Sequence, residues 1–141
     1  MTTGSRATGI SEFKNIEEIT GSNADNDKVI GSSNDDTFEI TGNSTGRINN
    51  TLSFKDIEEI DGATGTDSLD YSSYSTPIEV NIGSRKATGV LAFSSIETVI
   101  GSSANTDSLI GSTNGDSFKI SGEYTGNVNN QVSFLAIEEL D

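Results

Sequence analysis

The chain has 141 residues and a formal net charge of −14, from 22 acidic and 8 basic side chains, and only 31% of it is hydrophobic. Nucleic acids and anionic membrane surfaces are bound by clustered lysine and arginine, so this charge excludes both as partners. Cysteine and histidine are absent, which excludes disulfides, zinc–thiolate sites and imidazole-based catalysis.

The chain begins with "MTTGSRATGIS", which lacks the apolar core of a secretory signal. No later apolar run approaches the ~20 residues of a membrane span. We therefore expect either a cytoplasmic protein or part of a longer protein whose export signal lies elsewhere.

The sequence is internally duplicated. Residues 7–61 align without a gap to residues 87–141, with 28 identities in 55 positions. Fixed repeats of this size are typical of stacked supersecondary units. We assign residues 1–6 to an N-terminal lead and residues 7–141 to a single β-solenoid, with a first module at 7–86 and a partial second module at 87–141.

Shorter periods lie inside this repeat. Four copies of an F-x-x-I-E phrase, such as "SFKDIEEIDG", begin at Phe13, Phe54, Phe93 and Phe134. A series of apolar residues recurs every 19 to 21 positions, usually with a glycine two residues later: Ile19, Ile40, Ile60, Val80, Val99, Ile120 and Leu140. These spacings predict a unit of ~20 residues repeated about seven times.

Apolar residues around this series alternate with polar ones, which predicts strands at 38–40, 78–82 and 118–120. Second strands are expected at 29–30, 48–52, 69–71, 90–93, 109–110 and 128–132, with Gly/Asx turns between them. We predict an all-β parallel β-helix, a β-solenoid of about seven ~20-residue coils, in which Phe54, Ile57 and Ile60 form a core rung. The competing architecture is a β-sandwich, against which the regular spacing argues.

The turns "GSSNDDTFE" (31–39), "GATGTDSLD" (62–70) and "GSTNGDSFK" (111–119) resemble the nonapeptide of RTX (haemolysin-type) calcium-binding repeats. Residues 65–89 and 96–112 also resemble segments of large secreted bacterial adhesins. The resemblance implies a parallel β-roll or β-helix, export as part of a giant polypeptide, and Ca²⁺ held in the turns. The candidate metal ligands it implies are Asp27, Asp36, Asp67, Asp107 and Asp116.

This sequence departs from the family pattern. Asn34 and Asn114 replace the third glycine, and the aspartates at 27, 67 and 107 recur only in every second short unit. Ca²⁺ requires six to eight oxygens at 2.3–2.6 Å, which aspartates on alternate coils do not supply. We therefore favour Asx turns that need no cofactor, with weak Ca²⁺ sites as the alternative.

Glutamates recur beside the apolar series. If consecutive coils stack, four of them form a carboxylate ladder on the outer face: Glu18, Glu39, Glu59 and Glu79. A cation-attracting stripe is one interpretation of the ladder. The favoured interpretation is a solvated charged face that keeps the rod soluble, with Glu58 and Glu59 pointing mostly to solvent.

Active sites interrupt repeats, and here the interruptions are few: Tyr71, Tyr74, Pro77, Arg85 and Lys86. We therefore expect no enzyme, although some parallel β-helices act on polysaccharides. The expected function is a stalk, spacer or fibre-forming segment of a secreted bacterial repeat protein or adhesin, outside the cell or at its surface. The alternative is a Ca²⁺-binding RTX-like module that folds or stiffens on calcium. No cap is visible at residue 141, so the expected partners are neighbouring repeats of the same or an identical chain, stacked head to tail.

Overall fold

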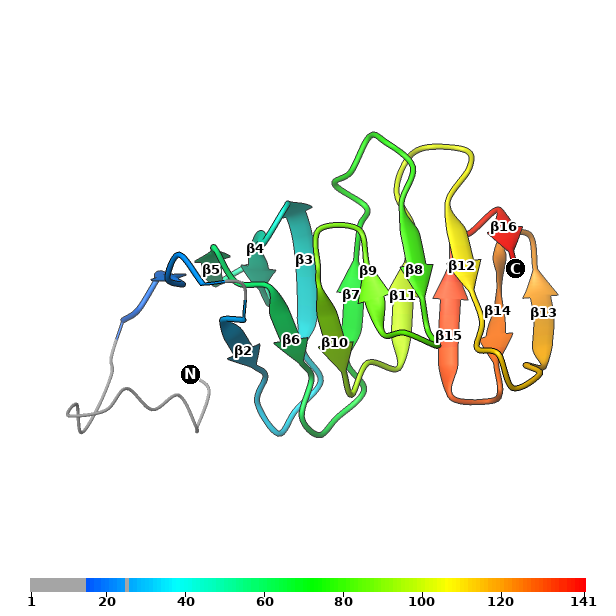
Figure 1. The fold of residues 1–141 in the computed structure, drawn as a ribbon, viewed down its shortest axis with the longest axis horizontal. Helices are drawn as coiled ribbons and strands as arrows, with labels where there is room; N and C mark the ends of the chain where they lie inside the picture. The colour runs from blue at the N-terminus through cyan, green and yellow to red at the C-terminus, as the bar shows by residue number, and fades with distance from the viewer. Residues whose placement is uncertain (1–14, 25) are drawn as a thin grey trace.

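A computed structural model describes residues 15–24 and 26–141, and it is all-β (Figure 1). The first copy of the duplicated sequence contains β1 (Glu18–Thr20), β2 (Lys28–Ile30), β3 (Thr37–Gly42), β4 (Thr45–Ile48), β5 (Leu52–Lys55) and β6 (Glu59–Asp61). The next segment, residues 62–95, contains β7 (Ser68–Asp70), β8 (Glu79–Asn81), β9 (Lys86–Ala87) and β10 (Ala92–Ser94), and β10 already lies in the second copy. The rest of the second copy contains β11 (Thr98–Ile100), β12 (Ser108–Ile110), β13 (Phe118–Gly122), β14 (Thr125–Val128), β15 (Val132–Leu135) and β16 (Glu139–Leu140). The predicted lead at 1–6 and Phe13 lie outside the described residues.

The strands form two layers that run along the long axis of the molecule (Figure 1). One layer is a nine-stranded sheet, called here the long sheet, in the order β1-β5-β4-β3-β7-β11-β15-β14-β13. The other layer contains a three-stranded sheet, β10-β6-β2, and a four-stranded sheet, β16-β12-β8-β9. The chain crosses repeatedly between the layers, and parallel strands stack coil on coil, which confirms the predicted β-solenoid.

The coils are longer and fewer than the sequence predicted. Parallel partners such as Glu79 with Ser108, or Glu18 with Ser53, lie much farther apart in the sequence than one short unit. The solenoid has about four turns, so the prediction of about seven coils is wrong in number. All seven residues of the apolar series do lie in strands, but some of these strands fold back within one layer rather than starting a new coil.

Antiparallel hairpins cause this difference. Strands β3, β4 and β5 form a meander inside the long sheet, and β13, β14 and β15 form its copy. Asn49 and Asn50 both have positive φ, 51° and 55°, as a tight hairpin turn between β4 and β5 requires. The strands expected at 48–52 and 128–132 are therefore turns at their centres, because asparagine adopts the left-handed conformation at low cost.

The duplication is present in the strand pairing as well as in the sequence. In the first copy Glu18 lies opposite Ser53 and Phe38 opposite Ile48. In the second copy the same pairs recur at the equivalent positions, for example Phe118 opposite Val128. Between β1 and its counterpart β11, five strands enter the long sheet and five enter the other layer. At ~4.8 Å between strands, one repeat advances the solenoid by about 24 Å.

The core is one contiguous cluster between the layers. Phe54, Ile57 and Ile60 are buried in it, which confirms the predicted core rung. Gly46 lies opposite Phe54 in the sheet, and a Cβ at Gly46 would come within 2.5 Å of the Phe54 ring. The glycine is therefore needed to let the aromatic ring lie across the neighbouring strand.

Glycines also allow the coils to approach at the corners. A Cβ at Gly62 would lie 1.9 Å from the carbonyl oxygen of Ser95, and one at Gly101 would lie 1.8 Å from that of Ala136. Ser95 and Ala136 have positive φ, 53° and 52°, although neither is a glycine or an asparagine. Contact between coils thus imposes this conformation on the residue that precedes each I-E pair.

The predicted ladder of four glutamates does not form. Glu18 and Glu39 lie in the long sheet but are separated by β5 and β4, whereas Glu59 and Glu79 lie in two different sheets of the other layer. Because one short sequence unit is not one coil, residues with that spacing do not stack. Glu59 instead lies in register with Lys28 on the coil before it.

Candidate functional site

Four of the five predicted metal-ligating aspartates end turns that begin with Gly-Ser, and Asp67 ends a turn that begins with Gly-Ala. In the first type of turn, one carboxylate oxygen of the aspartate accepts the backbone N–H of the serine five residues earlier. Asp27 accepts the Ser22 N–H and Asp107 accepts the Ser102 N–H, each at 2.6 Å. The same serines donate their hydroxyls to these carboxylates at 2.8 Å. Both aspartates therefore act as acceptors that close a turn.

Asp36 and Asp116 close a shorter turn in the same way. Asp36 accepts the Ser32 N–H at 2.6 Å, and its other oxygen accepts the Asn49 side-chain amide at 2.5 Å. Asp116 has equivalent bonds from Ser112 and from Asn129, the latter at 2.5 Å. The hydrogen bond from Asn129 and that from the Ser112 backbone lower the pKa of the Asp116 carboxyl. These aspartates thus link a turn to the hairpin of the same repeat.

Asp67 differs from the other four. Ala63 follows the glycine of its turn, where the other four turns have Ser22, Ser32, Ser102 and Ser112, so the serine hydroxyl is missing. The side chain is fully buried, and its Oδ2 has no hydrogen-bond partner. Burial raises the pKa of the Asp67 carboxyl, and the negative charges of Asp36 and Glu97 act in the same direction. Asp67 is therefore the one aspartate of this set with a buried, unpaired carboxylate oxygen.

Two of the aspartates also reach the neighbouring coil. Asp67 Oδ1 accepts the backbone N–H of Asp36 at 2.7 Å, and Asp107 Oδ1 accepts that of Ile78 at 2.8 Å. A carboxylate that accepts a backbone N–H makes a charge-assisted hydrogen bond, which is stronger than a neutral one. These contacts join consecutive coils at the turns.

The glutamate of the I-E pair supplies a second inter-coil contact that the sequence interpretation missed. Glu58 is buried rather than solvent-facing, and its Oε2 accepts the N–H of Asp27 at 3.2 Å. The same contact recurs at 2.9 Å in the other copies, from Asp67 to Glu97 and from Asp107 to Glu138. The signal was available in the sequence, because glutamate follows isoleucine in every copy of the phrase.

The structure thus brings some predicted ligands together and separates others. Asp36, Asp67 and Glu97 are linked on three successive coils, whereas Asp27 and Asp107 are each linked to one glutamate. Within residues 15–24 and 26–141, no group of three acidic side chains has the geometry of a metal site. Most carboxylate oxygens in the set already accept backbone hydrogen bonds, so a bound Ca²⁺ would have to replace them.

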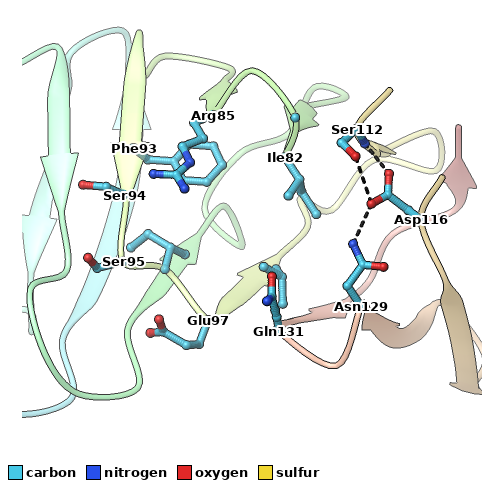
Figure 2. Close-up of a pocket in the computed structure, with 13 residues that line it drawn as sticks. Ile82, Arg85, Phe93, Ser94, Ser95, Glu97, Ser112, Asp116, Asn129 and Gln131 are labelled. Carbon is cyan, nitrogen blue, oxygen red and sulfur yellow. Dashed lines mark hydrogen bonds between the residues drawn. The ribbon is translucent and has the colours of Figure 1, made fainter. Parts of the chain in front are cut away.

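A second feature is an open groove of about 550 Å³ (Figure 2). It lies beside Ile82 and Arg85, in the segment that follows the first copy of the repeat. Arg85 and Phe93 lie at one end of it, and the bonded set of Asp116, Ser112 and Asn129 lies at the other. Arg85 has positive φ (56°), and its carbonyl accepts the Phe93 N–H at 2.9 Å. Among the described residues Arg85 forms no ion pair. The groove combines a cation, amides and a buried aromatic ring, and its two lining carboxylates, Glu97 and Asp116, already accept the backbone N–H groups of Asp67 and Ser112.

Comparisons with protein-family models, with curated proteins and with solved structures found no match for this chain. The part of the chain that the structure describes contains no helix long and apolar enough to cross a membrane.

Proposed function

We propose that this chain is a structural repeat segment whose role is to lengthen a rod. In this role it would serve as a stalk, spacer or fibre-forming element of a secreted bacterial repeat protein or adhesin, outside the cell or at its surface. The observation that carries the proposal is the internal duplication, because both copies stack along one axis with the same register. A duplicated unit that continues one core adds length rather than a separate binding domain.

The polar groups support the same role. The carboxylates of Asp67, Asp107 and Glu58 accept backbone N–H groups from neighbouring coils, so they stabilise stacking. The net charge of −14 disfavours lateral association of identical rods. We assign no catalytic role to the chain, and the proposed partners are further repeats of the same kind.

A Ca²⁺-binding module that stiffens on calcium is the alternative. The unpaired Oδ2 of Asp67, close to Asp36 and Glu97, is the observation that favours it. In this alternative the ion would add oxygen ligands from the exposed turn and from water.

Thermal unfolding followed by circular dichroism distinguishes the two roles. If the chain is a spacer, its β-sheet spectrum and its melting temperature should be the same in EDTA and in millimolar Ca²⁺, at matched ionic strength. A melting temperature that rises and saturates with Ca²⁺, but not with Mg²⁺ or NaCl, would support the alternative. The Asp67→Asn variant is the control, since it should abolish a Ca²⁺ response that depends on this carboxylate.

The spacer role also predicts how the length of the molecule increases with the number of repeats. Chains that carry one or two further copies of the full repeat should grow in maximum dimension by about 24 Å per copy in small-angle X-ray scattering. A maximum dimension that stays constant as copies are added would contradict the proposal.

A further inference from the structure

The outer edge of β13 differs from the same edge in the first copy. In the first copy β3 is paired on one side with β4 and on the other with β7. In the second copy β13 is paired, among the strands of the described residues, with β14 only, and it lies at the end of the long sheet (Figure 1). The same strand is therefore covered in one copy and open in the other.

Apolar side chains on the two strands reflect this difference. Ile40 is fully buried, whereas its counterpart Ile120 is 58% exposed. In the other layer Ile60 is 1% exposed, whereas its counterpart Leu140 is 37% exposed. The open end therefore presents apolar side chains from both layers, and the first copy shows what buries them.

The covering segment in the first copy is residues 62–95, which contains β7 to β10. Leu69 of β7 lies in register with Phe38 of β3, and Phe93 of β10 lies in register with Ile60 of β6. The Gly89 carbonyl accepts the N–H of Ser44 at 2.9 Å, in the turn after β3. One segment thus caps the ends of both layers.

We infer that the open end formed by β13 and β16 is a docking surface for another segment of the β7–β10 type, carried by a further repeat. This inference rests on the proposed role as a repeat segment. The number of strands supports this occupant. Of strands β11 to β16, four lie in the long sheet and two in the other layer. A β7–β10 segment adds one to the long sheet and three to the other layer, which makes five in each.

The competing occupant is the N-terminal end of a second copy, whose first described strand is β1. Charge favours the β7 type of strand. In the first copy Glu39 lies opposite Asp70, two like charges. Lys119 replaces Glu39 in β13, so an arriving Asp70 would meet an opposite charge, which is favourable across parallel strands.

The test is to append a second copy of residues 62–95 directly after Asp141. Amide hydrogen exchange of Phe118–Gly122 is then compared between the original and extended chains. We expect exchange of these amides to slow by at least about tenfold on extension, since edge amides gain partners. The matched control carries Leu69→Asp in the appended copy only, which keeps length and removes the central apolar contact. In that control the slowing should be lost.

Unchanged exchange of the β13 amides in the extended chain would overturn the inference. It would also be overturned if the original chain formed a dimer in sedimentation and protected β13 as its concentration rose, because a second copy would then be the occupant. Neither result depends on calcium or on rod length. If the added units lengthen the rod while β13 stays unprotected, the spacer role stands and only this docking surface fails.

Discussion

The Glu58 carboxylate accepts a hydrogen bond from the backbone N–H of Asp27, a residue 31 positions earlier in the chain. The next residue, Glu59, lies in β6 and is half-buried, and it is paired in register with Lys28 of β2. Two adjacent glutamates thus have different surroundings. One joins coils through the backbone, and the other faces a neighbouring strand.

Replacing Glu58 with alanine should therefore cost much more stability than replacing Glu59. Glu58→Ala leaves the Asp27 N–H without its acceptor, so we expect the free energy of unfolding to fall by about 1–3 kcal/mol. Glu59→Ala should change it by no more than about 0.5 kcal/mol. Urea denaturation followed by circular dichroism measures both values. Equal losses in the two variants would contradict a specific role for Glu58.

The duplication offers a second matched pair. Ile40 and Ile120 occupy equivalent positions, but the first is fully buried and the second is mostly exposed. Ile40→Ala should lower the free energy of unfolding by about 2–5 kcal/mol, because it removes buried methyl groups and leaves a cavity.

Ile120→Ala should lower the free energy of unfolding by about 0.5 kcal/mol or less, as at a surface position. Both variants are measured by urea denaturation under the same conditions. A large loss at Ile120 would mean that this side chain is already covered in solution, and it would point to self-association through β13.

The strands and the core could be predicted from sequence because their signals are local. Alternation of apolar and polar residues in short segments places Ile19, Val80 and Val99 in strands whatever the coil length. The number of coils was not predictable from spacing alone. A strand that returns through a hairpin has the same spacing as one that crosses to the other layer. The Asn49–Asn50 pair was the local sign of a hairpin.

Other features depend on contacts between coils. Asp56, Ser95 and Ala136 share a positive φ of 52° or 53° although their side chains have nothing in common. Each is held there by the coil against which it packs, and its carbonyl approaches a corner glycine such as Gly101. Likewise, the role of Glu58 depends on a backbone N–H from another coil. Sequence patterns show that such residues recur but not what they contact.

Asp67 gives a prediction about pH. Burial raises the pKa of its carboxyl above the ordinary value of 3.8, with Asp36 and Glu97 acting in the same direction. In the unfolded chain the carboxyl titrates at its ordinary pKa. The folded state therefore binds this proton more tightly than the unfolded state does. As the pH falls from the raised pKa towards 3.8, protonation of Asp67 favours folding, and above the raised pKa that contribution is lost.

The Asp67→Asn variant isolates this contribution, because an amide can still accept the Asp36 N–H but carries no charge. We expect the variant to be more stable than the original chain at pH 7, with a difference that shrinks as the pH approaches 4. Asp116→Asn is the control, and it should change the stability at pH 7 in the opposite direction. The pKa of Asp116 is lowered, so its charge stabilises the fold above 3.8 and the variant should be less stable at pH 7. Urea denaturation at pH 7, 5.5 and 4 measures both. If the difference caused by Asp67→Asn is the same at all three pH values, the ionisation of Asp67 is not its source.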